Sequence, residues 1–318
     1  MSGNNSIAPN GLRIHQRVLK LMGNRFELSV VSDDEQWAQQ RIDEAIAEIQ
    51  RIEKILTTFD EGSQTNLINQ QAGIRPVKAD RELLQIIQRS IRISELTQGA
   101  FDITYGSIDK RLWNFDQNMT SLPSPEIARQ LVRLINYRNI EIDETAGTLF
   151  LKEKGMRIGF GGIGKGYAAE QAKKIMRAHN VTSGIVNASG DLTVWGTQPN
   201  GSPWTIGIAN PDQANEYFSS VQLTDTSIAT SGNYEKYVII DGIKYSHTIN
   251  PKTGLPIRGI KSVTIITPNA EFADALATPI SVMGIQVGLG LINQLKNVAC
   301  IIIDDFNQVY TSNNIKIS

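Results

Sequence analysis

A glycine-rich stretch with one lysine, Gly159–Ile175 (GFGGIGKGYAAEQAKKI), has the residue types that bind phosphate. Five glycines occupy positions 159 to 166, with Lys165 among them, and a helix-forming run follows. Glycines let backbone N–H groups crowd around a ligand, and a helix N-terminus presents unpaired N–H groups with a partial positive charge. The pattern predicts a strand, a glycine loop and a helix that form a phosphate cradle, with Lys165 facing the phosphate.

Two known phosphate motifs match this stretch in part. Gly159, Gly161 and Gly164 satisfy the G-x-G-x-x-G pattern of dinucleotide-binding folds, although that pattern usually lies in the first strand–helix–strand unit. The stretch also begins like a P-loop, but Gly166 stands where a P-loop has the Ser or Thr that holds magnesium. A glycine-rich turn packed against a sheet, with Lys165 in solvent, accounts for the same residues without a ligand.

A carboxylate and a hydroxyl near the C-terminus have the spacing of a metal site. Asp274 and Thr278 are four residues apart in an expected helix, so their side chains share one face. Their oxygens suit magnesium, a hard cation. The alternative is that Asp274 is a carboxylate near a helix start and Thr278 bonds back to its own helix.

One histidine and two phenylalanines lie in expected loops. His247 precedes Asn250-Pro251 and is either a general base or oxyanion ligand, or a structural or solvated histidine. Phe59 and Phe101 either pack in the core or contact a planar heterocycle.

The composition is that of an ordinary globular protein. The 318 residues are 41% hydrophobic and 20% charged, and the net charge of −1 provides no field that would recruit nucleic acid. With one cysteine (Cys300) and three histidines, a zinc site of the usual kind is not expected. No run is long enough for a membrane span. The polar N-terminus indicates a cytosolic protein, or one from which a leader was removed, so the compartment stays open.

Amphipathic helices and short strands alternate along the chain without a strict strand–helix–strand order. Ile42, Ile46, Ile49 and Ile52 form one apolar stripe on a helix expected to end near Leu56. Several strand pairs have hairpin turns, for example around Met22-Gly23-Asn24 and at Asp241-Gly242. The chain is therefore expected to be α+β, with mixed or antiparallel sheets and packed helices. Residues 1–18 are expected to be a flexible segment and residues 19–318 a single domain.

Several stretches together resemble the ApbE family. They are MGNRFEL, FDEGSQTNLIN, GAFDITYG, GGIGKGYAAE, ATSGNYEK, SHTINPKTGLP and ADALAT, in that order. The resemblance spans about residues 19 to 285. Each motif is modest alone, but their order and spacing are specific, and they outweigh the dinucleotide-fold and P-loop alternatives.

The resemblance implies a T-fold-like architecture and an FAD:protein FMN transferase. Such enzymes use magnesium to move the FMN moiety of FAD onto a threonine hydroxyl of a partner flavoprotein, with release of AMP, and some members instead hydrolyse FAD. The implied FAD contacts are Met22, Phe59, Ala100, Phe101, Asp102, Lys165 and Thr248. The implied magnesium ligands are the Gly162 carbonyl, the Asp274 carboxylate and the Thr278 hydroxyl. The implied catalytic residues are His247, Lys165 and Asp102.

The chain departs from the family pattern at three positions. Gly159 stands where the family usually has an aspartate that contacts FAD, Asn250 replaces another aspartate, and Ser246 stands where a second histidine is common. Family members are also commonly exported and lipid-anchored, and this sequence has no lipobox. A transferase is therefore the leading expectation, with an FAD pyrophosphatase or a non-catalytic FAD-binding protein as alternatives.

Overall fold

A computed structural model of the chain describes residues 11–109, 119–209, 217–232 and 237–315. Within these ranges the helices are α1 (Glu35–Leu56), α2 (Gln64–Gln70), α3 (Arg81–Leu96), η1 (Ile103–Ser107), α4 (Pro125–Leu131), η3 (Tyr137–Asn139), α5 (Gly164–Ala178), α6 (Ala270–Met283) and α7 (Ile285–Ile292). The strands are β1 (Arg13–Leu21), β2 (Asn24–Ser32), β3 (Val77–Lys78), β4 (Ile140–Asp143), β5 (Thr148–Leu151), β6 (Gly184–Ala188), β7 (Asp191–Trp195), β8 (Trp204–Ala209), β9 (Tyr217–Leu223), β10 (Thr226–Gly232), β11 (Tyr237–Ile240), β12 (Ile243–Ser246), β13 (Ile260–Thr267), β14 (Ala299–Asp304) and β15 (Val309–Thr311). Helices and antiparallel strands together confirm the α+β prediction. Over the same ranges, no helix combines the length and apolar character that a bilayer span requires.

The chain divides into two compact units. Unit 1 takes its described residues from Met1–Glu53, Ile163–Thr230 and Thr264–Asp274, and unit 2 from Lys54–Gly162, Ser231–Val263 and Ala275–Ser318. The single domain expected over residues 19–318 stays a prediction. Of the ATSGNYEK motif, residues 233–236 lie outside the described ranges.

Unit 1 begins with a long hairpin. Arg13–Leu21 pairs residue by residue with Asn24–Ser32, and Met22 and Gly23 between them have φ of 50° and 74°. This confirms the hairpin predicted around Met22. It also corrects the flexible segment expected for residues 1–18, because β1 begins at Arg13 and is bonded to β2 along its whole length. Residues 1–10 of that segment lie outside the described ranges.

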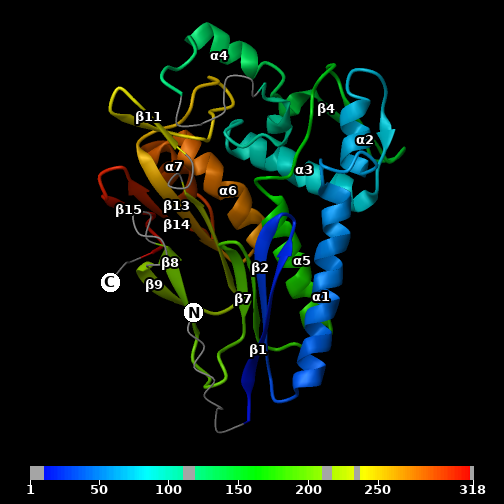
Figure 1. Ribbon diagram of the computed structural model, residues 1–318, viewed down its shortest axis with the longest axis vertical. Coiled ribbons are helices and arrows are strands. Elements are labelled where there is room, and N and C mark those ends of the chain that lie inside the picture. The colour runs from blue at the N-terminus through cyan, green and yellow to red at the C-terminus, as the bar shows by residue number, and fades with distance from the viewer. Residues whose placement is uncertain (1–10, 110–118, 210–216, 233–236, 316–318) are drawn as a thin grey trace. The chain divides into compact units, whose positions relative to one another are not determined.

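The sheet of unit 1 has the strand order β1-β2-β6-β7-β10, followed by the part of β13 from Thr264 onward. In Figure 1, α1 and α5 run along the same side of this sheet, and α5 packs on β6 and β7. The stripe Ile42, Ile46, Ile49 and Ile52 on α1 is buried, as its helical spacing predicts. The helices and the sheet thus enclose an apolar core that fixes the start of α5.

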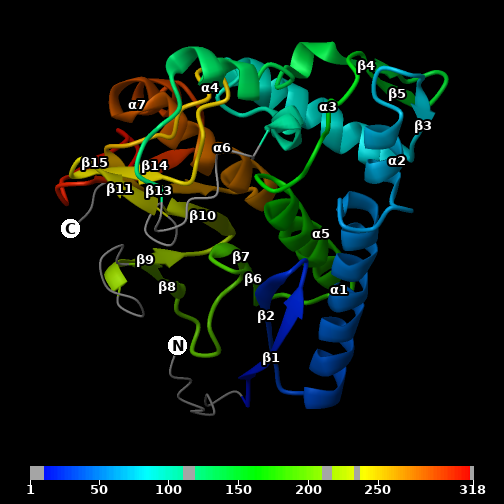
Figure 2. The same cartoon turned by 45° about the horizontal axis from the view of Figure 1, so that its top comes forward.

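Unit 2 contains several smaller sheets. The strand orders of two of them are β3-β5-β4 and β11-β12, and β14, β15 and the first part of β13 belong to the eight-stranded sheet β1-β2-β6-β7-β10-β13-β14-β15. Figure 2 shows β3, β4 and β5 beside α2 and α3. The β11–β12 hairpin turns at Asp241 and Gly242, both with positive φ, as the sequence predicts.

The start of α5 and the start of α6, both in unit 1, cap each other. The Oδ2 atom of Asp274 in α6 accepts a 2.9 Å hydrogen bond from the N–H of Gly166 in the first turn of α5. Conversely, the Oε2 atom of Glu170 in α5 accepts a 3.0 Å hydrogen bond from the N–H of Ala270, the first residue of α6. We call this pair of contacts the reciprocal caps. Each helix supplies the carboxylate that the N-terminus of the other requires.

The reciprocal caps need a glycine at the crossing. A Cβ at Gly166 would lie 2.2 Å from the carbonyl oxygen of Ala270 and 2.7 Å from the Cβ of Asp274. Backbone atoms cannot move aside as a flexible side chain can, so the two helices approach this closely only with glycine at position 166.

We expect Gly166→Ala to destabilise the protein by about 1–3 kcal/mol or more, because the added methyl group pushes α5 and α6 apart. Urea unfolding followed by circular dichroism measures this change. Gly161→Ala is the matched control, since a Cβ there meets no atom within 4 Å, and it should unfold close to the wild type. Equal stability of Gly166→Ala and Gly161→Ala would contradict the close crossing.

Candidate functional site

The segment that enters the glycine loop is not a strand. β5 ends at Leu151, Gly155 turns the chain with φ of 89°, and Ile158 continues outside any sheet. The side chain of Asn69 takes the place of a strand partner, because its Oδ1 accepts from the N–H of Ile158 at 2.7 Å and its Nδ2 donates to the carbonyl at 3.1 Å. The strand predicted upstream is present only as β5, before the Gly155 turn, and the residues between that turn and the loop are not the extended strand expected there, whereas the predicted helix after the loop is present as α5.

The predicted phosphate cradle at the start of α5 is partly occupied by protein. The N-cap residue Ile163 has no side-chain hydrogen bond to offer, and the buried carboxylate of Asp274 instead accepts from the N–H groups of Gly166 and Lys165. Both donors belong to the first turn of α5, where a helix N-terminus attracts an anion. Asp274 engages these two N–H groups, and the phosphate cradle with Lys165 facing the phosphate stays a prediction.

Lys165 lies with two carboxylates that come from separate strands and helices of unit 1. Its ammonium forms an ion pair with Asp191, the first residue of β7, and it also acts electrostatically on Asp274. The side chain of Asp191 is 4% exposed, against 26% for that of Lys165. We call Lys165, Asp191 and Asp274 the Lys165 cluster.

The Lys165 cluster holds two buried acids against one cation. Burial, and next the charge of Asp191, raise the pKa of Asp274 to about 7, against the opposing effect of Lys165 and the two N–H groups. Burial also raises the pKa of Asp191, although Lys165 and the N–H of Thr230 favour its charged form. Because two carboxyl groups face one ammonium, a second cation bound here would be attracted by the carboxylates.

Asp191 was not among the predicted site residues. It follows the turn Ser189-Gly190 between β6 and β7. A signal was present, since an aspartate next to glycine at the end of an apolar strand is a common ligand position. Its pairing with Lys165, 26 residues earlier, depends on the tertiary fold.

The predicted magnesium ligands have the right oxygen types. The Oδ2 atom of Asp274 serves the reciprocal cap, and the hydroxyl of Thr278 donates to Ser231 at 3.3 Å and so keeps lone pairs to offer a metal. Thr278 thus does not bond back to its own helix, which was the alternative. Within the described ranges no group of three or more His, Cys, Asp or Glu side chains forms a metal site. Asp274 belongs to unit 1 and Gly162 and Thr278 to unit 2, so the three-ligand site stays a prediction.

Asp102 is tied into the scaffold of unit 2. Its carboxylate accepts hydrogen bonds from the N–H and hydroxyl of Thr104, at 2.9 and 2.6 Å, and from the N–H of Tyr137 at 2.9 Å. Burial raises its pKa despite these bonds. The carboxylate therefore caps η1 and joins it to η3.

The predicted flavin contacts in unit 2 include both buried and open side chains. Phe101 is buried, and its ring lies 3.6 Å from where a Cβ of Gly162 would be, whereas Phe59 is 98% exposed. Core packing thus explains Phe101 but not Phe59. Ala100 is buried next to Phe101, and Met22 lies in unit 1 at the β1–β2 turn.

The loop that carries His247 is held firmly in unit 2. Ile249 is buried in an apolar cluster with Ile108 and Leu131, and its N–H donates to the hydroxyl of Tyr105 at 3.1 Å. Gly254 has φ of 71° and packs so closely on the carbonyl of Ala128 that a Cβ would lie 1.9 Å away. The loop therefore presents His247 and Thr248 from a fixed backbone.

Comparison with known proteins gives one consistent result. A model of the ApbE family matches residues 22–302. The chain belongs to the ApbE family. It is 29% identical to the FAD:protein FMN transferase of Klebsiella pneumoniae over 92% of this chain and 89% of that protein.

Solved structures of ApbE proteins have the same fold. The crystal structure of the ApbE protein of Thermotoga maritima superposes with a TM-score of 0.84 at 28% identity, covering 95% of this chain and 98% of that one. The apo form of the flavinyl transferase ApbE of Pseudomonas stutzeri gives a TM-score of 0.82 at 26% identity and covers 95% of both chains. These matches confirm the ApbE-like architecture.

The three departures from the ApbE pattern have different structural consequences. The Oδ1 atom of Asn250 accepts from the N–H of Lys252 at 2.9 Å, which the aspartate usual in the family would also do, so the loop turn survives. The hydroxyl of Ser246 accepts from the N–H of Thr248 at 3.0 Å and supports the same loop. At Gly159 a Cβ would meet no atom within 4 Å, so space exists for the side chain that is missing.

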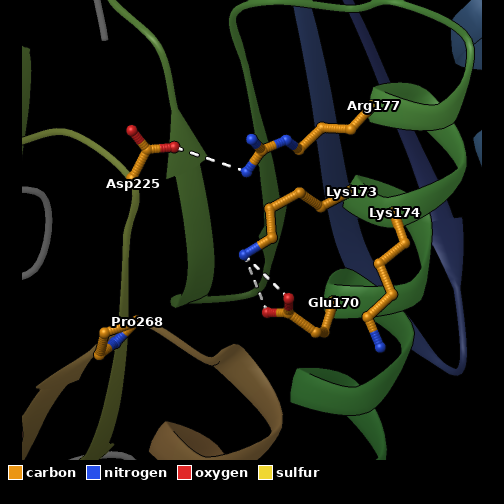
Figure 3. Close-up of a pocket in the computed structure, with 6 residues that line it drawn as sticks. All are labelled: Glu170, Lys173, Lys174, Arg177, Asp225 and Pro268. Carbon is orange, nitrogen blue, oxygen red and sulfur yellow. Dashed lines mark hydrogen bonds and ion pairs between the residues drawn. The ribbon is translucent and has the colours of Figure 1, made fainter.

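A pocket of about 440 Å³ lies on the flank of α5 toward its C-terminal end (Figure 3). Its lining residues are Glu170, Lys173, Lys174, Arg177, Asp225 and Pro268. Lys173 pairs with Glu170 at 2.9 Å, and Arg177 pairs with Asp225 at 3.7 Å. The pocket contains none of the residues predicted to contact FAD, and its charged groups largely neutralise one another, so we do not assign it to the flavin.

We expect Asp274→Asn to reduce the pH dependence of stability. The pKa of Asp274 is about 7 in the folded protein against an ordinary 3.8, so the folded state holds this proton more tightly than the unfolded chain does. The wild type therefore loses stability as the pH rises from about 4 to 7, and the loss is complete above that range. Urea unfolding with chelator present measures the free energy of unfolding at pH 5 and pH 8. Relative to the wild type, Asp274→Asn should have a higher free energy of unfolding at pH 8 than at pH 5. An equal difference between the two proteins at both pH values would contradict the raised pKa.

Proposed function

We propose that the protein is an FAD:protein FMN transferase, which moves the FMN moiety of FAD onto a threonine hydroxyl of a partner flavoprotein and releases AMP. The observation that carries this proposal is the family match over residues 22–302, which includes the Lys165 cluster and the His247 loop. The names of the relatives from Klebsiella pneumoniae and Pseudomonas stutzeri support a flavin transferase.

The reaction exchanges one phosphorus–oxygen bond for another. The threonine oxygen attacks the phosphorus of the FMN phosphate, the bond from that phosphorus to the bridging oxygen breaks, and AMP leaves with the bridging oxygen. The hydroxyl proton passes to a base, and nothing is oxidised or reduced. If water takes the place of threonine, the products are FMN and AMP, which is the competing hydrolase reaction.

We assign the base to His247 rather than to Asp102. The Asp102 carboxylate already accepts hydrogen bonds from Thr104 and Tyr137, so protonation would weaken the cap of η1. His247 lies on a firmly held loop next to Thr248, a predicted FAD contact. A neutral imidazole can accept the threonine proton at neutral pH.

Lys165 provides positive charge for the pyrophosphate in this proposal. Negative charge grows on the bridging oxygen as the bond breaks, and a positioned ammonium stabilises it. Magnesium, when bound, supplies further charge neutralisation at the phosphate oxygens. Gly162, Asp274 and Thr278 would hold it through a carbonyl, a carboxylate and a hydroxyl.

Incubation of the purified protein with FAD and magnesium, with and without an acceptor flavoprotein domain, tests the function. We expect AMP to be released with the acceptor present, and intact-mass spectrometry to show one FMN moiety added to it. An acceptor in which valine replaces the target threonine should stay unmodified, and excess chelator should stop the transfer. AMP release without any acceptor would indicate a hydrolase, and FAD binding without AMP release would indicate a binding protein.

We expect Lys165→Ala to lower the turnover number by about 10²–10³-fold, because removal of a charge contact that strengthens in the transition state typically costs that much. The initial rate of AMP release at saturating FAD measures the change. Lys165→Arg should recover only part of the loss, since a planar guanidinium does not copy a point charge in a tight loop.

Lys174→Ala is the matched control, because Lys174 is an exposed lysine on the same helix and lines only the pocket on its flank. Its turnover should stay close to that of the wild type. Turnover of Lys165→Ala within about twofold of the wild type, well short of the expected range, would remove Lys165 from the proposed chemistry.

A further inference from the structure

We propose that Asp191 is a positioning residue that fixes the ammonium of Lys165 for the pyrophosphate of FAD, an inference that rests on the proposed function. Its carboxylate is the ion-pair partner of Lys165, and its side chain is only 4% exposed. Asp191 is the first residue of β7 and is buried, whereas Lys165 lies in the first turn of α5 and is partly exposed.

The backbone holds Asp191 rigidly. It stands directly after a two-residue turn, in which Ser189 and Gly190 have φ of 56° and 102°, and it pairs with Ala188 across the hairpin. The side chain of Asn187 closes the same turn by accepting from the N–H of Gly190 at 2.9 Å. β6 and β7 are inner strands of the unit 1 sheet, so hydrogen-bonded strands on both sides hold the backbone that carries this carboxylate.

The Asp191 carboxylate is also held from the neighbouring strand. The N–H of Thr230 in β10 donates to it, and the hydroxyl of Thr230 is bonded in turn to that of Thr264 in β13 at 3.0 Å. Lys165, in contrast, has four rotatable methylene bonds. Because one partner is fixed and the other flexible, the ion pair restricts the lysine rather than the aspartate.

A purely structural ion pair is the alternative explanation. Buried ion pairs contribute little net stability, because the cost of removing both charges from water offsets their attraction. The Lys165 side chain is 26% exposed, against 4% for that of Asp191, so the lysine lies at the boundary of the core rather than inside it. An ammonium held in place before the substrate arrives loses less entropy when the negative charge develops.

A double-mutant cycle tests the positioning role. The variants are Asp191→Asn, Lys165→Met and their combination, and the readouts are kcat, the KM for FAD and the melting temperature. We expect Asp191→Asn to lower kcat by about 10-fold or more, and to change it less than about twofold when Lys165 is already methionine, because residues that act through each other are not additive. Asp225→Asn is the matched control. It removes a carboxylate that pairs with Arg177, which lies on α5 like Lys165, and the kcat of this variant should not change.

Additive losses in the cycle, with both single variants folded, would overturn the proposal and leave Asp191 a structural residue. If Asp191→Asn does not fold, Asp191→Ser enters the same cycle, because its smaller side chain removes the charge without crowding the buried site. The same additivity criterion then decides.

Measurements of FAD and riboflavin binding distinguish a failure of this inference from a failure of the proposed function. If the wild type releases no AMP with any acceptor, the transferase proposal fails, and the dissociation constants for FAD and riboflavin are compared across the same cycle. The inference is supported if Asp191→Asn weakens FAD binding in the protein that keeps Lys165 but not in the Lys165→Met variant, while riboflavin binding is unchanged. Such a result means that Asp191 positions Lys165 toward the pyrophosphate. Equal weakening of FAD and riboflavin overturns it.

Discussion

The reciprocal caps between α5 and α6 are the contact on which the rest of unit 1 depends. Asp274 caps α5, Glu170 caps α6, and the glycine at position 166 lets the two backbones approach. A helix N-terminus in the interior must find hydrogen-bond acceptors, and here each helix finds them on the other. The same contact places Lys165 beside the carboxylate of Asp274, so the helix crossing and the candidate site are formed together.

The electrostatics of the Lys165 cluster oppose stability and favour ligand binding. Two carboxylates are buried against one ammonium, and burial raises the pKa of both Asp191 and Asp274. A fold selected for stability alone would have fewer buried charges here, because each one is removed from water. A magnesium ion or another cation at Asp274 would relieve this strain, which links the proposed metal to the stability of the same helices.

Local features were predictable from the sequence because they depend on neighbouring residues. The buried stripe of α1 and the Asp241-Gly242 turn follow from helical periodicity and from residues that adopt positive φ. The residues directly before the glycine loop are not the strand expected there, because the side chain of Asn69 supplies the hydrogen bonds that a strand partner would give. Nothing local to Ile158 indicates a partner 89 residues away.

The family, the α+β class and the residue types of the candidate site could all be predicted from motif order and hydrophobic periodicity. The tertiary structure alone decided how those residues are used: Asp274 fills the helix N-terminus that was expected to bind phosphate, and Asp191 holds Lys165. The physical reason is that motif spacing records which groups are available, whereas hydrogen-bond partners and burial depend on which strands and helices pack together. A glycine loop therefore predicts close backbone approach, and only the fold shows that the approaching backbone is α6.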